Sequence, residues 1–250
     1  MLSQGKEYSK LNEKKRVSGL PELVPPRTIR LKFIKVGTLQ YISHLDLQRT
    51  FNRIINRACL PVWYTQGFNP HIKMVFSTPL SVGSESVCEY LDIRIDREMS
   101  CEEIMERINA EMTEEFHVVD AYVPNSDFSE IKWASYKINM FTKGASESLA
   151  CDVQSVLTTS PLTLVKKTKA GEKEIDIIPL ISSVSAKYNA ESGEIEIETT
   201  VSASTTEYLN PEMLISGMKN KLGILSGDPK VEHYSILRTN LFKEDMTVFS

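Results

Sequence analysis

Two apolar periodicities alternate along this chain, and their order constrains the fold more than any other feature. From Thr28 to Val36 apolar and polar residues alternate, which is typical of a half-buried strand. From Ser43 onward the apolar residues recur at helical spacing until Pro61 ends the pattern. Ser43 can cap this helix, and Asp46 three residues later forms a near variant of the capping box. The sequence therefore predicts a strand followed by an amphipathic helix.

The rest of the first half completes the order β-α-β-β-α-β. The expected elements are short strands at 62–64 and 71–77 around a Gly/Asn/Pro loop, a strand at 87–96, a helix opened by the capping box of Ser100 and Glu103, and a closing strand at 116–123. This order is the split βαβ pattern of ferredoxin-like folds. The first half is thus predicted to form one such lobe.

The second half repeats the plan loosely. The expected elements are strands at 132–142, 162–169, 173–178, 181–189, 194–203 and 234–242, with helices at 146–158 and 210–222. We therefore predict an α+β fold of two tandem ferredoxin-like (βαββαβ) lobes with antiparallel sheets. The first lobe is expected at 27–125 and the second at 130–250, after a flexible N-terminal tail at 1–26.

Positive charge is concentrated in one segment. The whole chain has a net charge of −4, yet between Arg27 and Phe76 eight basic residues stand against one acid, Asp46, a net +7 that leaves −11 elsewhere. A focused basic surface attracts a polyanion, although such charges also serve simply to solvate a helix and a strand. The residues expected to bind nucleic acid are Arg30, Lys32, Lys35, Arg49, Arg53, Arg57, Phe68 and Lys73.

Other features narrow the class of protein. No apolar run approaches the roughly 18 residues that a membrane-spanning helix needs, and the first residues lack the apolar centre of a secretory signal. The four cysteines form no CxxC pair, so neither a disulfide framework nor a cysteine-rich metal site is expected. The chain lacks CxxxCxxC and phosphate-loop motifs, so no cofactor is expected. These features predict a cytoplasmic protein without a membrane partner.

Three motifs between residues 43 and 90 resemble one bacterial family. They are Ser43-His44-Leu45-Asp46, then Gly67-Phe68-Asn69-Pro70-His71, then Gly83-Ser84-Glu85-Ser86 followed by Glu89-Tyr90. In these motifs the chain resembles the radical-SAM-linked protein family, a domain of unknown function found fused to or encoded beside cobalamin-binding radical SAM proteins. The similarity is strongest over residues 28–95. It implies a radical SAM partner enzyme and a setting of tRNA or rRNA.

Two histidines are candidates for acid–base chemistry. His44 and His71 flank the basic segment with Tyr41 nearby, and histidine has an unperturbed pKa near neutrality. A histidine beside a tyrosine can support metal-independent RNA cleavage, as in the repeat-RNA-processing nucleases of CRISPR systems, which this chain also resembles in its tandem lobes. The alternative is that His44 packs at a helix start and His71 holds a turn. His44, Asp46 and His71 form too thin a set to predict a metal site.

The loop around Phe68 is predicted to carry function. Phe68 lies among basic residues and can stack an unpaired base, while Gly67, Asn69 and Pro70 shape the turn. Glu89 shares its strand face with apolar residues, so it needs a partner and is expected to hold this loop. The leading hypothesis is an RNA-binding accessory of a radical SAM enzyme. The alternatives are a metal-independent endoribonuclease and an adaptor that docks an acidic protein.

Overall fold

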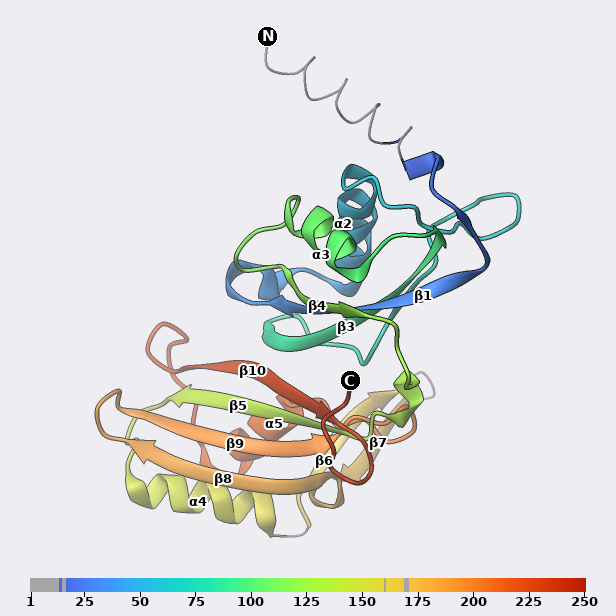
Figure 1. The fold of residues 1–250 in the computed structure, drawn as a ribbon. Coiled ribbons are helices and arrows are strands. Elements are labelled where there is room, and N and C mark those ends of the chain that lie inside the picture. Colours follow the sequence, from blue (N-terminus) through green and yellow to red (C-terminus); the bar gives the residue numbers. More distant parts are fainter. Residues whose placement is uncertain (1–13, 15–16, 160, 169–170) are drawn as a thin grey trace. The chain divides into compact units, whose positions relative to one another are not determined.

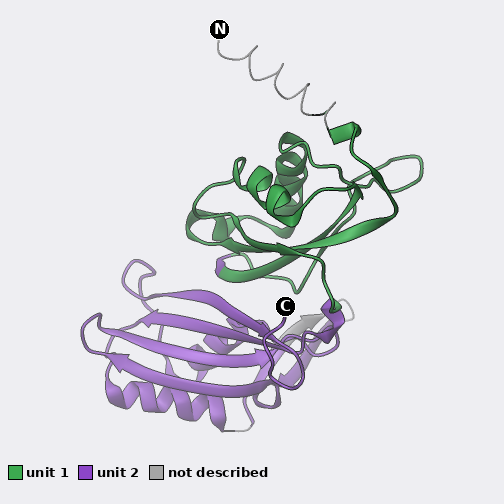
Figure 2. Cartoon of the chain, in the orientation of Figure 1, with its two compact units in different colours: residues 1–82, 86–127, 250 green, residues 83–85, 128–249 purple. Residues whose placement is uncertain are grey.

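The computed structural model describes residues 14, 17–159, 161–168 and 171–250. The chain divides into two compact units, which Figure 2 shows in separate colours. Unit 1 comprises residues 1–82, 86–127 and 250, and unit 2 comprises residues 83–85 and 128–249. The sequence places the boundary between residues 125 and 130, and the chain changes unit after Asp127. Residues 1–13, 15 and 16 of the predicted tail lie outside the described residues.

The described part of unit 1 contains a four-stranded antiparallel sheet and two longer helices (Figure 1). The strands lie in the order β4-β1-β3-β2. In chain order the elements are β1 (Glu22–Lys35), the 3-10 helix η1 (Gly37–Tyr41), α2 (His44–Arg57), β2 (Met74–Phe76), β3 (Ser84–Arg97), α3 (Cys101–Asn109) and β4 (Val118–Tyr122).

The core of unit 1 fixes α2 against the sheet. The rings of Phe33 in β1, Phe51 in α2 and Phe116 meet edge to face. The centroid of Phe33 lies 4.9 Å from that of Phe51 and 5.8 Å from that of Phe116, and the centroids of Phe51 and Phe116 are 5.1 Å apart. Burial of one such side chain stabilises the fold by about 1.5–3 kcal/mol, and edge-to-face packing adds to that. Alternate residues of β1 and β3, among them Leu31 and Ile93, complete the cluster. The opposite face of α2 is therefore held pointing away from the core.

α2 begins at the predicted position because its first turn is capped. The Oγ atom of Ser43 accepts a hydrogen bond from the backbone N–H of Asp46, at 3.2 Å. Such a cap is worth about 1 kcal/mol. The helix ends at Arg57, and Pro61 follows shortly after. The helix that carries the three arginines is thus defined at both ends by local sequence.

β1 begins earlier than the sequence predicts. The strand starts at Glu22, whereas residues 1–26 were expected to form a tail. Glu22 pairs with Arg97, but the next pair is Arg27 with Ile95, so the register shifts between them. The intervening residues include Pro25 and Pro26, which have no N–H group to give to a ladder. A shift at this point lets the strand continue through residues that a regular ladder would exclude.

The chain between α2 and β3 is less regular than predicted. The expected strand at 62–64 consists of two isolated bridges, Val62 with Ile95 and Tyr64 with Ile72. The expected strand at 71–77 is reduced to the three residues of β2. The segment between Tyr64 and Ile72, which the second bridge closes, is consequently a loop that extends from the sheet.

In the described part of unit 2, four strands pair antiparallel in the order β10-β5-β9-β8. β6 and β7 form a separate two-stranded ribbon. The sequence analysis predicts both strands but does not separate them from the sheet. In chain order the elements are η2 (Phe128–Glu130), β5 (Trp133–Phe141), α4 (Glu147–Thr158), β6 (Thr163–Thr168), β7 (Gly171–Asp176), η3 (Ile178–Leu180), β8 (Ile181–Asn189), β9 (Glu194–Ser202), α5 (Glu212–Leu222) and β10 (His233–Phe242).

A buried carboxylate organises the chain between α5 and β10. Glu232 accepts hydrogen bonds from Oγ1 of Thr142 at 2.8 Å, from the backbone N–H of Lys143 at 3.0 Å, and from the backbone N–H of Gly227. These bonds lower the pKa of Glu232 below its ordinary value, and the bond from Lys143 has the largest effect. Glu232 thereby ties the segment after α5 to the end of β5.

The described part of the chain is a mixed α and β protein with four α-helices and mainly antiparallel strand pairing. None of the helices in these residues is both long enough and apolar enough to cross a bilayer.

Candidate nucleic-acid interface

The exposed face of α2 carries three arginines. Leu47, Phe51, Ile54 and Ile55 are the buried residues of this helix. Arg49, Arg53 and Arg57 are four residues apart and project from the other side, at intervals of about 6 Å along the axis. The side chains of Arg49 and Arg57 are 63% and 64% exposed, and Arg53 is exposed as well. A row of guanidinium groups at this spacing can bind several acceptor oxygens of a polyanion.

Two of the three arginines also contact carboxylates. Arg49 lies 3.2 Å from Oδ1 of Asp46, and Arg57 lies 2.6 Å from Oε2 of Glu111. The Ser43 hydroxyl and then Arg49 hold the pKa of Asp46 below its ordinary value. Arg53 forms no ion pair with any described residue. The Arg49–Asp46 pair is exposed on both sides, and such pairs are worth only about 0–1 kcal/mol, so a phosphate group can compete for Arg49. Arg57 keeps 64% of its side chain exposed while it pairs with Glu111.

A loop closed by hydrogen bonds between its ends extends beside the C-terminal end of α2. We call Thr65–His71 the Phe68 loop. The backbone N–H of Thr65 donates to the carbonyl of His71 at 2.9 Å, and the N–H of His71 donates to Oγ1 of Thr65 at 3.1 Å. Nδ1 of His71 also lies 3.2 Å from the carbonyl of Asn69. The two ends of the loop are thus joined, and His71 has the structural role that we considered for it as an alternative.

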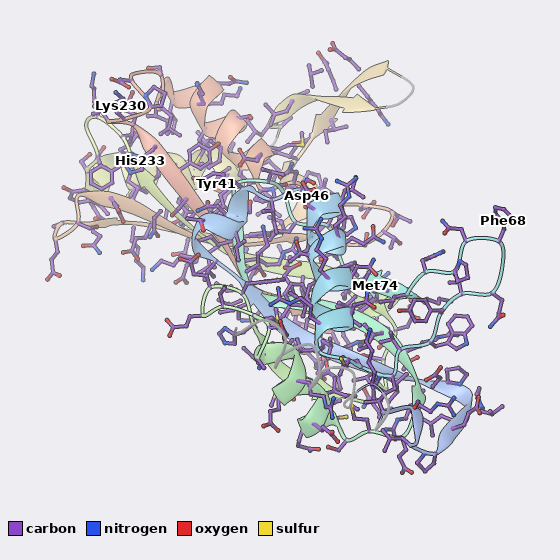
Figure 3. All side chains as sticks on the ribbon, turned by 90° about the horizontal axis from the view of Figure 1, so that it is seen from above. Tyr41, Asp46, Phe68, Met74, Lys230 and His233 are labelled. Carbon is purple, nitrogen blue, oxygen red and sulfur yellow. The ribbon has the colours of Figure 1, made fainter. Side chains whose placement is uncertain are left out.

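Phe68 lies at the tip of this loop and is fully exposed. Figure 3 shows its side chain projecting away from the rest of unit 1. The preceding residue, Gly67, has φ = +140°, a backbone conformation that residues other than glycine rarely adopt. Asn69 and Pro70 complete the exposed turn. An aromatic ring so placed makes no contribution to a core and is free to stack on a planar group.

A side-chain hydrogen bond joins α2 to Tyr64, the residue that precedes the loop. The hydroxyl of Tyr64 donates to Oδ1 of Asn56 at 3.2 Å. Asn56 belongs to the last turn of α2, between Arg53 and Arg57. Sequence analysis did not single out Asn56, because nothing in the local pattern reveals a partner eight residues away. The arginine face and the Phe68 loop therefore form one connected surface.

The basic residues of β1 do not belong to this surface. Arg30 is 1% exposed, and its guanidinium binds both carboxylate oxygens of Asp92 at 2.8 and 2.9 Å. It also donates to Oγ of Ser126 at 2.8 Å. Lys32 is half-buried, with Nζ 5.9 Å from the ring centroid of Tyr90. Because alternate residues of a strand point to opposite faces, both lie on the face away from α2.

Lys35 and Glu89 also differ from the sequence expectation. Lys35 is 3% exposed and directs Nζ toward the carbonyls of Leu39 and Gln40, each 3.4 Å away. Glu89 is buried opposite Phe33. The base of the Phe68 loop instead meets β3 near Arg94, about 17 Å further along the strand. Glu89 and the base of the Phe68 loop thus lie at different positions along β3.

The last of the residues expected to bind nucleic acid is Lys73. It is half-buried and follows Ile72, whose bridge to Tyr64 closes the loop. Of the eight residues expected to bind nucleic acid, the structure thus brings four into connected elements at the surface: Arg49, Arg53, Arg57 and Phe68. Lys73 adjoins this set through the loop.

The two candidate catalytic histidines lie at opposite ends of α2. His44 begins the helix, and its ring lies 5.0 Å from that of Phe76. From Phe76 back to His71 the nearly extended chain spans about 16 Å. Tyr41 is 68% exposed in η1, three residues before His44. No three His, Cys, Asp or Glu side chains in the described residues form a group that could hold a metal ion.

Comparison with known proteins adds a family. A family model described as "Uncharacterized protein conserved in bacteria (DUF2344)" matches residues 28–211. This agrees with the predicted resemblance to a domain of unknown function, and the description does not mention a radical SAM enzyme. No curated protein matches the chain.

Several solved structures match at low similarity. DyPB from Rhodococcus jostii RHA1 is 12% identical, with 89% of this chain and 95% of that chain covered and a TM-score of 0.21. A DypB variant in complex with manganese is 12% identical, with 85% of this chain and 93% of that chain covered, and also has a TM-score of 0.21. A DypB variant from Rhodococcus jostii RHA1 in complex with heme is 13% identical, with 85% of this chain and 91% of that chain covered and a TM-score of 0.22. TM-scores this low support no conclusion about fold or chemistry.

Proposed function

The chain belongs to the bacterial family whose model covers residues 28–211, and we propose that it is an RNA-binding accessory protein that works with a radical SAM partner enzyme in the modification or processing of tRNA or rRNA. The observation that carries RNA binding is the connected surface of α2 and the Phe68 loop. Three exposed arginines provide contacts to phosphates, and a fully exposed ring provides a stacking platform. This combination is typical of proteins that bind unpaired RNA.

A change at Phe68 tests the stacking part of this proposal. Stacking of a base on an aromatic side chain is worth about 1–3 kcal/mol, so Phe68→Ala should weaken binding of a short single-stranded RNA roughly tenfold. Because Phe68 makes no core contact, thermal stability should not change. Val82→Ala removes another exposed apolar side chain of unit 1 and serves as the control. Equal RNA affinity in the Phe68→Ala and Val82→Ala proteins would contradict the proposed role of Phe68.

The radical SAM partner rests on the family resemblance of the three motifs between residues 43 and 90. Copurification from native extract, followed by sequencing of bound RNA and identification of bound protein, tests it. We expect RNA and a radical SAM protein together. Recovery of an acidic protein without RNA would instead favour the adaptor, in which Arg49 and Arg57 exchange Asp46 and Glu111 for carboxylates of the partner.

The geometry gives the endoribonuclease little support. An acid–base pair must reach the same phosphodiester, whereas His44 and His71 lie on the order of 15 Å apart by chain geometry. We expect no cleavage of structured RNA in the presence of chelator between about pH 5 and 8, where histidine titrates. Cleavage that is abolished by His44→Ala or His71→Ala would overturn this expectation.

We also propose that each unit is a ferredoxin-like lobe. The strand orders β4-β1-β3-β2 and β10-β5-β9-β8 support this, because in both the first strand of the unit lies between its third and fourth. In each unit one helix follows the first strand and another precedes the last. The β6–β7 ribbon is then an insertion between the first helix and the second strand of unit 2. The proposal predicts that residues 128–249, prepared alone, retain a cooperative unfolding transition.

A further inference from the structure

The sheet of unit 2 has one face that is strongly polar. Along β5 and β9, Ile138 and Ile197 are fully buried, whereas their neighbours Lys137 and Glu198 point to the other face. In register across three strands, Lys137 lies opposite Glu198, and Glu198 lies opposite Ser185. We call this side the polar face of unit 2. It carries no part of the surface described above.

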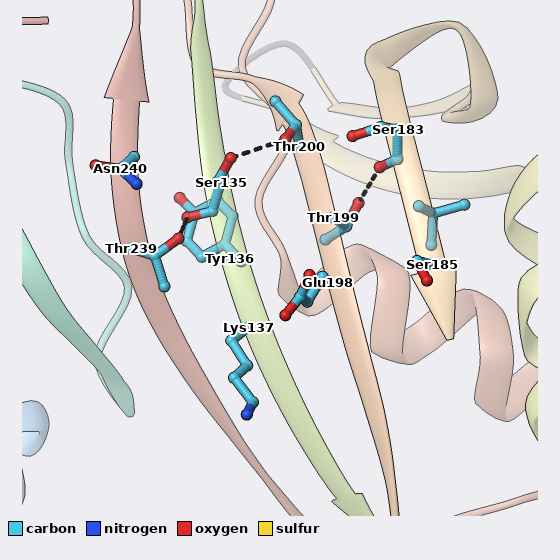
Figure 4. Close-up of a pocket in the computed structure, with 11 residues that line it drawn as sticks. Ser135, Tyr136, Lys137, Ser183, Ser185, Glu198, Thr199, Thr200, Thr239 and Asn240 are labelled. Carbon is cyan, nitrogen blue, oxygen red and sulfur yellow. Dashed lines mark hydrogen bonds between the residues drawn. The ribbon is translucent and has the colours of Figure 1, made fainter. Parts of the chain in front are cut away.

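A groove of about 470 Å³ lies on this face. Its lining is rich in hydroxyl groups: Ser135, Ser183, Ser185, Thr199, Thr200 and Thr239, with Tyr136, Lys137, Val184, Glu198 and Asn240 (Figure 4). Ser135 and Thr200 hydrogen-bond each other at 2.8 Å, and Thr199 donates to the carbonyl of Ser183 at 2.9 Å. These bonds fix the floor of the groove before any ligand arrives.

Three lining side chains have capacity left for a ligand. In the described part of the chain, Ser185, Glu198 and Asn240 form no side-chain hydrogen bond or ion pair. Lys137 does not neutralise Glu198, because its Nζ lies 3.2 Å from Oε2 of Glu196. Glu198 is exposed and keeps both carboxylate oxygens available as acceptors. The groove thus offers one strong anionic acceptor beside hydroxyl and amide groups.

This chemistry selects sugar hydroxyls and disfavours phosphate. A carboxylate accepts hydrogen bonds from the hydroxyls of a ribose, and the hydroxyl and amide side chains can donate to or accept from the same sugar. A phosphate at this position would be repelled by Glu198. The 2′-hydroxyl is the group by which a protein distinguishes RNA from DNA. A ribose is therefore the occupant that best fits the groove.

A ring pair on the same face can hold a base. Phe141 and His233 are opposite each other in β5 and β10, and their rings are stacked with centroids 5.3 Å apart and an interplanar angle of 11°. His233 is exposed. Phe141 lies four residues from Lys137 along β5, or about 13 Å. That separation fits a short RNA strand better than a single nucleotide.

We propose that the polar face of unit 2 binds single-stranded RNA and recognises a ribose 2′-hydroxyl through Glu198. The inference rests on the proposed RNA-binding function and adds selectivity for RNA over DNA. The contacts that we propose for the arginines of α2 do not depend on the sugar. Glu198 supplies the discrimination, and the His233–Phe141 pair supports a base.

The test compares RNA and DNA of one sequence, both single-stranded, in anisotropy titrations of the full chain. Wild type should prefer RNA. Loss of a hydrogen bond to a charged group should cost roughly tenfold in affinity, so Glu198→Ala should weaken RNA binding by that factor. DNA binding should stay equal or become tighter, because a repulsive charge is removed. Glu194→Gln, on the same strand outside the groove, should change neither.

The outcomes separate this inference from the function on which it rests. If Glu198→Ala tightens RNA and DNA binding together, or leaves both unchanged, Glu198 is only a nearby negative charge and the inference is wrong. Equal wild-type affinity for RNA and DNA would also overturn it while leaving RNA binding by α2 intact. Absence of binding to either strand would overturn the proposed function itself. Unchanged thermal stability of Glu198→Ala would show that the altered preference is not caused by misfolding.

Discussion

The hydroxyl of Tyr64 donates a hydrogen bond to Oδ1 of Asn56, with 3.2 Å between the two oxygens. This contact links the base of the Phe68 loop to the last turn of α2, between two of the arginines that we propose to bind RNA. Removing it in Tyr64→Phe should cost about 0.5–1 kcal/mol of stability. It should also speed amide exchange in the loop and weaken RNA binding a few-fold.

Tyr41→Phe provides the control for that change. Tyr41 is more exposed than Tyr64, and its hydroxyl forms no hydrogen bond with a described residue. We expect the same exchange rates and RNA affinity as in wild type. If Tyr64→Phe also behaves like wild type, the loop is held by its backbone bonds alone and is not coupled to α2.

Gly67 makes the Phe68 loop sensitive to backbone strain. A Cβ atom at this position would meet nothing within 4 Å, so only the positive φ of +140° resists substitution. Gly67→Val should therefore destabilise the loop by about 1–3 kcal/mol and redirect Phe68, with loss of RNA binding and little change in the global unfolding temperature. Gln66→Val, at an exposed neighbour, should be close to neutral. RNA affinity like that of wild type in Gly67→Val would show that the loop is a mere connector.

Elements defined by local signals could be predicted from the sequence. The helix caps of Ser43 and Ser100 place α2 and α3 correctly, and β8 has the predicted bounds, residues 181–189. Each of these rests on periodicity or on a cap within a few residues. The same holds for the outward direction of Arg49, Arg53 and Arg57, which follows from helical spacing.

Features that depend on distant partners could not be predicted. The alternating pattern of β1 predicts that Arg30 is an exposed basic residue. Its partners Asp92 and Ser126 are 62 and 96 residues away in the sequence. Glu89 shares a strand face with its neighbours, but only the register shows that it lies opposite Phe33. The groove near Glu198 likewise needs four strands in register, which no single segment of sequence reveals.

Arg30 provides a prediction about stability. Arg30→Met removes the cation that Asp92 binds, and breaking a buried pair costs about 3–5 kcal/mol. Because Asp92 keeps 17% of its side chain exposed, we expect a value near the lower limit, measured by urea unfolding. Lys32→Met, on the same face of the same strand, should change stability by about 0.5 kcal/mol or less. Equal losses in the two variants would mean that Arg30 is not a structural residue.

Glu232 provides a prediction about pH. Its pKa is lowered in the folded protein by bonds from Lys143, Thr142 and Gly227, so the carboxylate stabilises the fold above the ordinary value of 4.5 and loses this effect as pH falls through the lowered pKa. Glu232→Gln should therefore be less stable than wild type at neutral pH, and the difference should shrink on acidification. Glu191→Gln, at an exposed turn, should show no such trend. A difference that stays constant with pH would contradict the assigned role.

The salt dependence of RNA binding tests the central claim most directly. Replacing Arg49, Arg53 and Arg57 together with alanine should cost little stability, because the Arg49–Asp46 pair is exposed and alanine favours a helix. If these arginines bind phosphates, RNA affinity should fall sharply, and the slope of log K against log salt should shrink by about 2, at roughly 0.7 per lost contact. A folded triple variant with the affinity and salt slope of wild type would contradict the account.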